Sequence, residues 1–158
     1  MIYATLKTLH LLSIVVWIGG MVFAHFFLRP AVVQLEPAAR VRLMHDVLGR
    51  FFKAVLVASL LTLGSGLWML GRVAKQAVQS GGAFEMPIAW TIMAVLGIAM
   101  VAIFLHIRFA LYKRLSQAVA ASQWAAGGSA LAQIRTWVSI NLGVGVLILI
   151  VTLMRLPS

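Results

Sequence analysis

The stretch from Pro87 to Leu111 reads PIAWTIMAVLGIAMVAIFLHIRFAL, and it decides the fold. It contains no acidic residue, and its single lysine or arginine, Arg108, lies near its end. A helix needs ~20 mostly apolar residues to cross the hydrocarbon core of a bilayer. The stretch is long enough to do so, and it therefore predicts a membrane-spanning helix.

Three other stretches have the same character: Tyr3 to Leu28, Phe51 to Leu70 and Val138 to Met154. The composition agrees, because 63% of the residues are hydrophobic and 10% are charged, whereas a soluble domain is about half apolar and a quarter charged. We therefore expect an all-α integral membrane protein, one four-helix bundle over residues 1–158. The first stretch lacks the basic leader of a signal peptide, so we expect it to be retained as a helix.

The connections between the spans carry local signals. Proline restricts the residue before it and lacks a backbone donor, so Arg29-Pro30 is expected to stop or kink the first helix. Residues 38–53 mix apolar and charged side chains, which suits a short amphipathic interfacial segment that lies at the membrane surface or projects below it before the second span. Ser80-Gly81-Gly82 predicts a turn, and Gly127-Gly128 are expected to separate the third and fourth helices.

The net charge of +10 follows the topology more closely than it follows any nucleic-acid surface. Nine of the thirteen lysines and arginines flank the first and third connections: Arg29, Arg40, Arg42, Arg50, Lys53, Arg108, Lys113, Arg114 and Arg135. The positive-inside rule then places both termini outside the cytoplasm. We expect the basic inner side to attract anionic lipid headgroups, and we expect no nucleic-acid partner.

One face of the first helix carries His10, Trp17, Met21 and His25, since at ~100° per residue these four positions fall within roughly 80°. An imidazole is costly in lipid, so this face is expected to point into the bundle. His10 and His25 are separated by a rise of roughly 22 Å, so they cannot share one metal ion.

Three histidines are expected near the inner side. His106 lies at a depth close to that of His25, on a face with small residues such as Ala99 and Ala102, which suits an interior position. We therefore predict that His25 and His106 approach each other and that His45 joins them. Imidazoles can ligate a metal or haem, and Arg29 and Arg108 could hold haem propionates. The alternative is that each histidine is a hydrogen-bonded packing residue.

Other ligands are few. The chain has no cysteine, and its three carboxylates, Glu36, Asp46 and Glu85, all lie in predicted connections. Five methionines lie at depths comparable with that of His10 and could supply thioethers to a copper site, although methionine also fills packing gaps: Met1, Met69, Met86, Met93 and Met154. Asn141, in the middle of a span, is expected to find an interhelical partner.

Several short motifs along nearly the whole chain resemble the CopD family of copper-resistance membrane proteins. They are Lys7-Thr-Leu-His10, Trp17-Ile-Gly-Gly20, Leu61-Thr-Leu-Gly-Ser-Gly66-Leu-Trp68, Leu105-His106, Arg135, Asn141 and the closing Leu156-Pro157. The resemblance implies movement of copper across the bacterial inner membrane, often together with a periplasmic copper carrier. We therefore expect a minimal version of the family, with fewer spans than the larger members and without a fused carrier domain.

The same outline is also similar to HemJ, a four-helix protoporphyrinogen oxidase that holds haem b. That resemblance implies His10 and His106 as haem ligands and implies a redox partner. The third helix lacks the lysine of the HemJ pattern, since none lies between Pro87 and Arg108. Three classes of function stay open at this point: a copper-handling membrane protein, a haem-dependent redox protein, and a non-catalytic scaffold or partner subunit.

Overall fold

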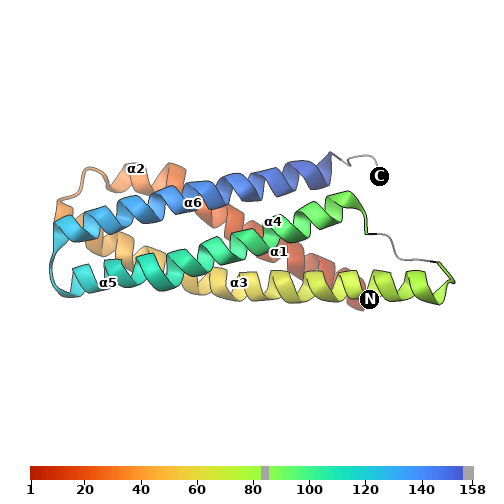
Figure 1. Ribbon diagram of the computed structural model, residues 1–158. Coiled ribbons are helices and arrows are strands. Elements are labelled where there is room, and N and C mark those ends of the chain that lie inside the picture. The colour runs from red at the N-terminus through yellow and green to blue at the C-terminus, as the bar shows by residue number, and fades with distance from the viewer. Residues whose placement is uncertain (83–85, 155–158) are drawn as a thin grey trace.

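The computed structural model describes residues 1–82 and 86–154. Four helical rods in it are long and apolar enough to cross a membrane, as predicted. They run lengthwise side by side. The start of α1 (Ile2–Val22), the end of α3 (Pro37–Gln79), the start of α4 (Ile88–His106) and the end of α6 (Trp124–Leu153) lie at the same end of the bundle (Figure 1). The described residues contain helices and turns, with no strand.

The rods are assembled from these elements. The first comprises α1 (Ile2–Val22), η1 (Phe23–Leu28) and α2 (Arg29–Val32); the second is α3 (Pro37–Gln79); the third comprises α4 (Ile88–His106), η2 (Ile107–Leu111) and α5 (Tyr112–Ala120); the fourth is α6 (Trp124–Leu153). α1 packs mainly along α3, while α4 and α5 pack along α6. Each rod extends beyond its predicted span.

The first rod does not stop at Arg29-Pro30, contrary to one of the two outcomes expected there. It continues to Val32, and the six residues immediately before Arg29 form a π-helical turn, η1. A π turn changes the hydrogen-bond ladder locally, and proline removes one donor from that ladder. The π-helical turn η1 therefore lies just where Pro30 would interrupt the regular α-helical hydrogen bonds.

The amphipathic stretch 38–53 is the first part of α3, which begins with Pro37 in its first turn and continues into the span without a break. Its apolar residues Val41, Met44 and Leu48 are buried. This segment therefore lengthens the bundle beyond the second span. Of the two expected arrangements, it has the one in which the segment projects from the span.

Gly81 and Ser122 end two of the rods in the same way. After α3, Gly81 adopts a positive φ of 80°, and the amides of Gly81 and Gly82 donate to the carbonyls of Val78 and Ala77. This is a Schellman ending, in which glycine is favoured because it has no Cβ. The turn predicted at Ser80-Gly81-Gly82 is confirmed.

After α5 the same backbone pattern occurs at Ser122, which has φ 54°, with the amides of Ser122 and Gln123 donating to the carbonyls of Val119 and Ala118. The third connection is therefore Ala121 to Gln123, and the separation predicted at Gly127-Gly128 is wrong. Both glycines lie inside α6, where Gly127 is buried against Val41 and Ala118. The small size of Gly127 serves close packing of α6 against α3 and α5, and in the sequence such a glycine resembles a turn signal.

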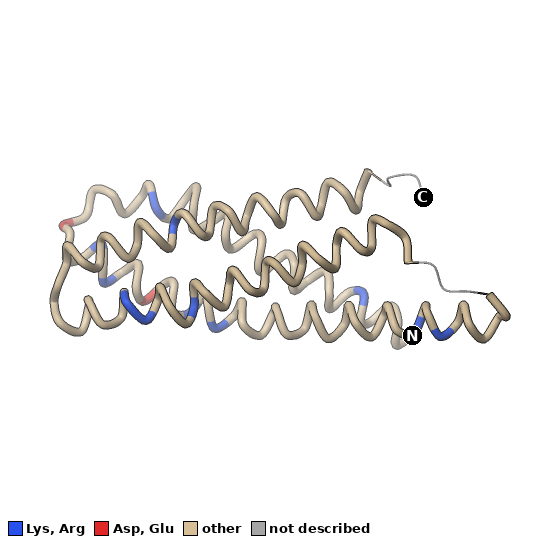
Figure 2. The backbone as a smooth tube through the Cα atoms, in the orientation of Figure 1, with Lys and Arg blue, Asp and Glu red and all other residues tan. Residues whose placement is uncertain are grey.

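The bundle has two different ends. We call the end with the connections at residues 33–36 and 121–123 the basic end. The opposite end, where α1 and α4 begin and α3 and α6 end, is the terminal end. Lysines and arginines gather at the basic end, and few lie near the other (Figure 2). The large buried side chains also lie in the middle of the bundle and toward the basic end, and they include Trp17, Met21, Phe52, Phe104, Ile107 and Leu115.

Candidate functional site

His10 lies in α1 and makes an interhelical hydrogen bond with Ser65 of α3, with Nδ1 2.9 Å from Oγ. The Ser65 hydroxyl also bonds to the carbonyl of Leu61 one turn earlier on its own helix. With its proton directed to Leu61, Ser65 Oγ accepts from His10 Nδ1–H. Nε2 of the neutral ring then carries the lone pair that a metal ion needs, because hydrogen bonding at one ring nitrogen sets the role of the other.

The surroundings of His10 bring α1 and α3 close together. A Cβ on Gly66 would lie 3.4 Å from His10 Cε1, so the backbone of α3 passes directly beside the ring. Met69 follows Ser65 by four residues, which places it on the same face of α3 one turn closer to the terminal end. Among the predicted thioethers, Met1 and Met154 are 109% and 71% exposed, whereas Met69 is half-buried.

The predicted face of the first helix is confirmed. Trp17 and Met21 are buried, His10 and His25 are partly buried, and Ser13 on the same side is buried as well. Trp17 packs edge to face on Phe104 of α4, with ring centroids 5.9 Å apart. The histidines of this helix therefore border the bundle interior.

His25 and His106 contact opposite sides of α6. His25 Nδ1 lies 3.3 Å from Ser139 Oγ, whereas the His106 ring lies 5.0 Å from the Trp137 ring. Residues 137 and 139 differ by ~200° around a helix. The predicted approach of these two histidines is therefore wrong, because α6 lies between them.

The face of the third helix that carries His106 points outward. His106 and Ala102 are exposed, and Val95 is 61% exposed, while the opposite face buries Met100, Phe104, Ile107 and Leu111. Small residues such as Ala99 and Ala102 predicted an interior position for this face, and that prediction is wrong. In this helix the interior is filled instead by large apolar side chains.

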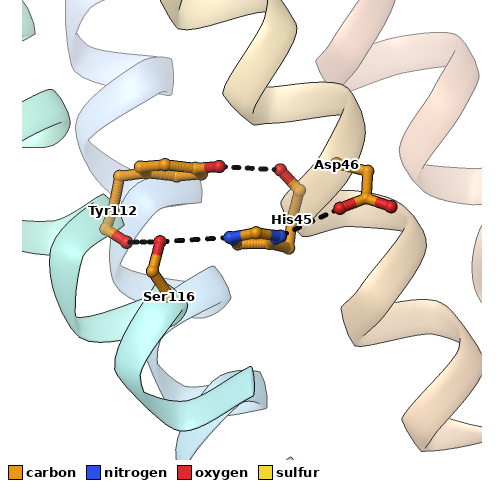
Figure 3. A network of polar contacts seen from close by, with 4 residues as sticks. All are labelled: His45, Asp46, Tyr112 and Ser116. Atoms are coloured by element: carbon orange, nitrogen blue, oxygen red, sulfur yellow. Dashed lines mark hydrogen bonds and ion pairs between the residues drawn. The ribbon is translucent and has the colours of Figure 1, made fainter. Parts of the chain in front are cut away.

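His45 takes part in a polar network between α3 and α5 (Figure 3). Its Nδ1 lies 3.0 Å from Asp46 Oδ1, its Nε2 lies 3.1 Å from Ser116 Oγ, and its ring stacks on Tyr112 with centroids 5.2 Å apart. Tyr112 donates to the carbonyl of His45 (3.1 Å), and the Ser116 hydroxyl donates to the carbonyl of Tyr112 (3.0 Å). Both ring nitrogens of His45 are therefore engaged in contacts with neighbouring side chains.

The network occupies both nitrogens of His45, so in this arrangement it is a helix clamp with no free nitrogen for a metal. Within residues 1–82 and 86–154, no three histidine, aspartate or glutamate side chains form a group that could hold a metal ion. The expected inner cluster of three imidazoles is therefore wrong. Tyr112 and Ser116 were missed in the sequence because their partner lies about seventy positions earlier in the chain.

The histidines implied by the HemJ resemblance do not fit one haem. His25 and His106 contact residues of α6 that are two positions apart, Ser139 and Trp137, so both lie near the same level of the bundle. His10 is fifteen residues before His25, a rise of roughly 22 Å. Two axial nitrogens on one iron are ~4 Å apart, given bonds near 2 Å, so His10 and His106 cannot be such a pair.

The predicted arginines lie at two separate places near the basic end. Arg108 has its guanidinium carbon 5.2 Å from the Tyr112 ring centroid and lines a groove with Arg50 and Lys53. Its Nε is buried without a hydrogen-bond partner among the described residues. Arg29 instead lines a pocket of about 270 Å³ with His25, Arg40 and Arg135.

Asn141 is 1% exposed in the middle of α6, and its Oδ1 has no hydrogen-bond partner among the described residues. The interhelical clasp expected for this amide is therefore not formed in this part of the chain. A buried amide without a partner costs free energy, so Asn141 is an unsatisfied polar group within the core.

Comparison with known proteins identifies the family. The model of a family described as CopD, Copper resistance protein D, matches residues 45–155, which includes His45 and His106 but not the helix that carries His10. Neither the curated proteins nor the solved structures gave a match. The family match covers well over half of the chain and agrees with a bundle of four apolar helices, and the protein therefore belongs to the CopD family of multi-pass membrane proteins.

Proposed function

We propose that this protein handles copper in the bacterial inner membrane, in transport or homeostasis, with His10 as a copper ligand. Membership of a family described by copper resistance supports the choice of metal. The observation that carries the role of His10 is its bond to Ser65, which directs the lone pair of Nε2 away from that bond. Neutral imidazole is a good ligand for copper.

Met69 is the thioether best placed to assist. It shares a face of α3 with Ser65, since the two are four residues apart, and soft thioethers suit Cu(I). A His10 and Met69 pair would need no cysteine, in keeping with a chain that has none. His25, on the same rod as His10, would belong to a separate second copper site near the basic end. The ~22 Å rise between the two histidines rules out one shared ion.

The orientation in the membrane forms part of the proposal. The gathering of positive charges at one end supports placing that end in the cytoplasm and both termini outside. His10 would then lie in the outer half of the bilayer, where a periplasmic copper carrier would be the natural partner. Single cysteines at Ser80 and Gln34 test this: the first should react with an impermeant reagent from outside and the second should not, and the reverse result would overturn the orientation.

Copper binding to purified protein tests the role of His10. Wild type, His10→Ala and His106→Ala are purified in the same detergent, loaded with Cu(I), desalted and assayed for bound metal. We expect His10→Ala to lose most of its copper, because it removes the ligand. His106→Ala is the matched control: it also removes one imidazole from the middle of a rod, but one that is exposed beside Trp137.

Two results would overturn the proposal. One is unchanged copper content in His10→Ala that elutes and shows helical circular dichroism like wild type. The other is an equal loss in both variants. If wild type binds no copper and instead carries a Soret band, the haem class of function would replace the copper one.

A further inference from the structure

A pocket at the basic end brings together three helical rods. It is lined by η1 and α2 on one side, by the first part of α3 on another and by the first half of α6 on the third, and its volume is about 270 Å³. Its polar lining side chains are His25, Arg29, Arg40 and Arg135, and the rest of the lining is apolar or glycine. The pocket is thus apolar with positive charge on several sides.

No acidic side chain of residues 1–82 or 86–154 forms an ion pair with these arginines. Within the described residues the single ion pair is His45 with Asp46, away from this pocket. Arg40 makes one long bond, 3.5 Å, to the carbonyl of Val33, and Arg29 and Arg135 are near enough for their charges to repel each other. Positive groups held together without a counter-charge favour an anion between them.

The lining limits the kind of anion. Four of the fifteen lining residues are polar; the others include Val32, Val33, Met44, Leu48 and Phe51. A small free anion would leave these walls facing water, whereas a ligand with a phosphate and a hydrocarbon part satisfies both surfaces. Phe26 and Phe27, next to His25 in sequence, are 59% and 63% exposed on the outside of the same rod, where a lipid chain would continue.

We propose that this pocket is a binding site for an anionic phospholipid, with its phosphate held by Arg29 and Arg135 and its glycerol and first chain segments against the apolar wall. Guanidinium groups suit phosphate because they donate two parallel hydrogen bonds. Arg40 closes the α3 side of the site. The site shares no residue with the proposed copper site at His10, although its lining includes His25, the proposed second copper position.

The test measures binding of phosphatidylglycerol and of phosphatidylcholine with the same chains to the detergent-purified protein by native mass spectrometry. The variant is Arg29→Gln with Arg135→Gln. Its matched control is Arg72→Gln with Lys75→Gln, which removes two positive charges at the terminal end of the bundle. We expect the first pair to weaken phosphatidylglycerol binding roughly tenfold or more, because each arginine near a headgroup contributes about fivefold. The control should change it less than twofold.

A lysine variant, a photoreactive lipid and competing ligands test the proposal further. The Arg29→Lys with Arg135→Lys variant keeps the charge but lacks the two-donor guanidinium, so it should bind phosphatidylglycerol more weakly than wild type and more tightly than the glutamine pair. Binding as weak as that of the glutamine pair, with native helix content, would count against a phosphate held by charge. A photoreactive phosphatidylglycerol should label residues 128–138 of the wild-type protein. Equal weakening by both glutamine pairs, equal affinity for phosphatidylcholine, or full displacement by millimolar inorganic phosphate would each overturn the lipid site, the last in favour of a free anion.

Discussion

The basic end and the terminal end of the bundle are built on different principles. At the basic end the rods are held by buried apolar residues and by the network of His45, Tyr112 and Ser116. At the terminal end no side chain is buried in the described residues 2–12, 66–79, 88–99 or 146–153, and His10 with Ser65 lies at the border of that region. One end is closely packed in its interior, and the other buries no side chain in these ranges and borders the proposed copper ligand His10.

The largest effect that this contrast predicts is on stability. Gly127→Ala places a Cβ 2.7 Å from Cγ1 of Val41, a buried and stiff β-branched residue. We expect a loss of about 1–3 kcal/mol in the free energy of unfolding, since overpacking a core costs that much. Unfolding in mixed micelles measures it. Gly128→Ala, with no atom within 4 Å of its Cβ, is the control and should be neutral or slightly stabilising.

The corresponding change toward the terminal end is Gly145→Ala. Its Cβ would lie 3.2 Å from the chain ends of Ile18 and Met100, which can shift by rotation. A cost below that of Gly127→Ala is expected. A larger loss of unfolding free energy for Gly145→Ala than for Gly127→Ala would contradict the difference in packing between the two ends.

The second prediction concerns copper affinity. Ser65→Ala removes the group that orients His10, and loss of such an outer partner typically costs 10–100-fold in metal affinity. Ser59→Ala is the control, because this buried serine bonds only to the carbonyl of Leu56 on its own helix. Competition titration with a Cu(I) chelator gives both affinities. Equal affinities for the two variants would separate Ser65 from the metal site.

A smaller effect is expected from Tyr112→Phe. The change deletes the 3.1 Å bond to the carbonyl of His45 and keeps the stacked ring. The expected loss is about 0.5–1.5 kcal/mol in unfolding free energy. Tyr3→Phe, at the exposed start of α1, provides the comparison and should change nothing measurable. A larger cost for Tyr3→Phe would contradict the role given to the clamp.

The smallest predicted effect is that of Arg42→Gln, which removes a cation–π contact 4.8 Å from the Trp124 ring. Such contacts contribute about 0.5–1 kcal/mol at exposed sites. The corresponding contact of Arg72 with Trp68 at the terminal end is longer, 5.3 Å. Arg72→Gln should therefore cost less than Arg42→Gln in the same unfolding assay.

The sequence was sufficient for the fold and for one face of one helix. Apolar length predicted the four spans, and the spacing of Trp17 and Met21 predicted the inward face of α1, because both signals are local. The interior face of α4 was predicted wrongly because small residues such as Ala102 suit either a tight interface or a lipid-facing surface. A large apolar residue such as Phe104 is equally compatible with both environments. Only the contacts between rods show which face of α4 is interior.

The histidines show the same limit. Ser65, Ser116 and Ser139 each bond to a histidine far away in the sequence while bonding back to their own helix. A back-bonded serine looks structurally neutral in a sequence, so nothing local distinguished these three from Ser59 or Thr152. The position of α6 between His25 and His106 is likewise a property of the packing and of no single stretch.

The two π-helical turns, η1 and η2, have a consequence for evolutionary comparison. Each acts like a single residue inserted into an α-helix, so it advances the rest of its rod by ~100° relative to a regular helix. In an alignment with relatives whose helices are regular, one-residue gaps are expected within residues 23–28 and 107–111. Deleting one residue from η2, such as Phe109, should then leave both flanking faces in register, whereas the same deletion in the regular part of α4 should turn Phe104 out of the core.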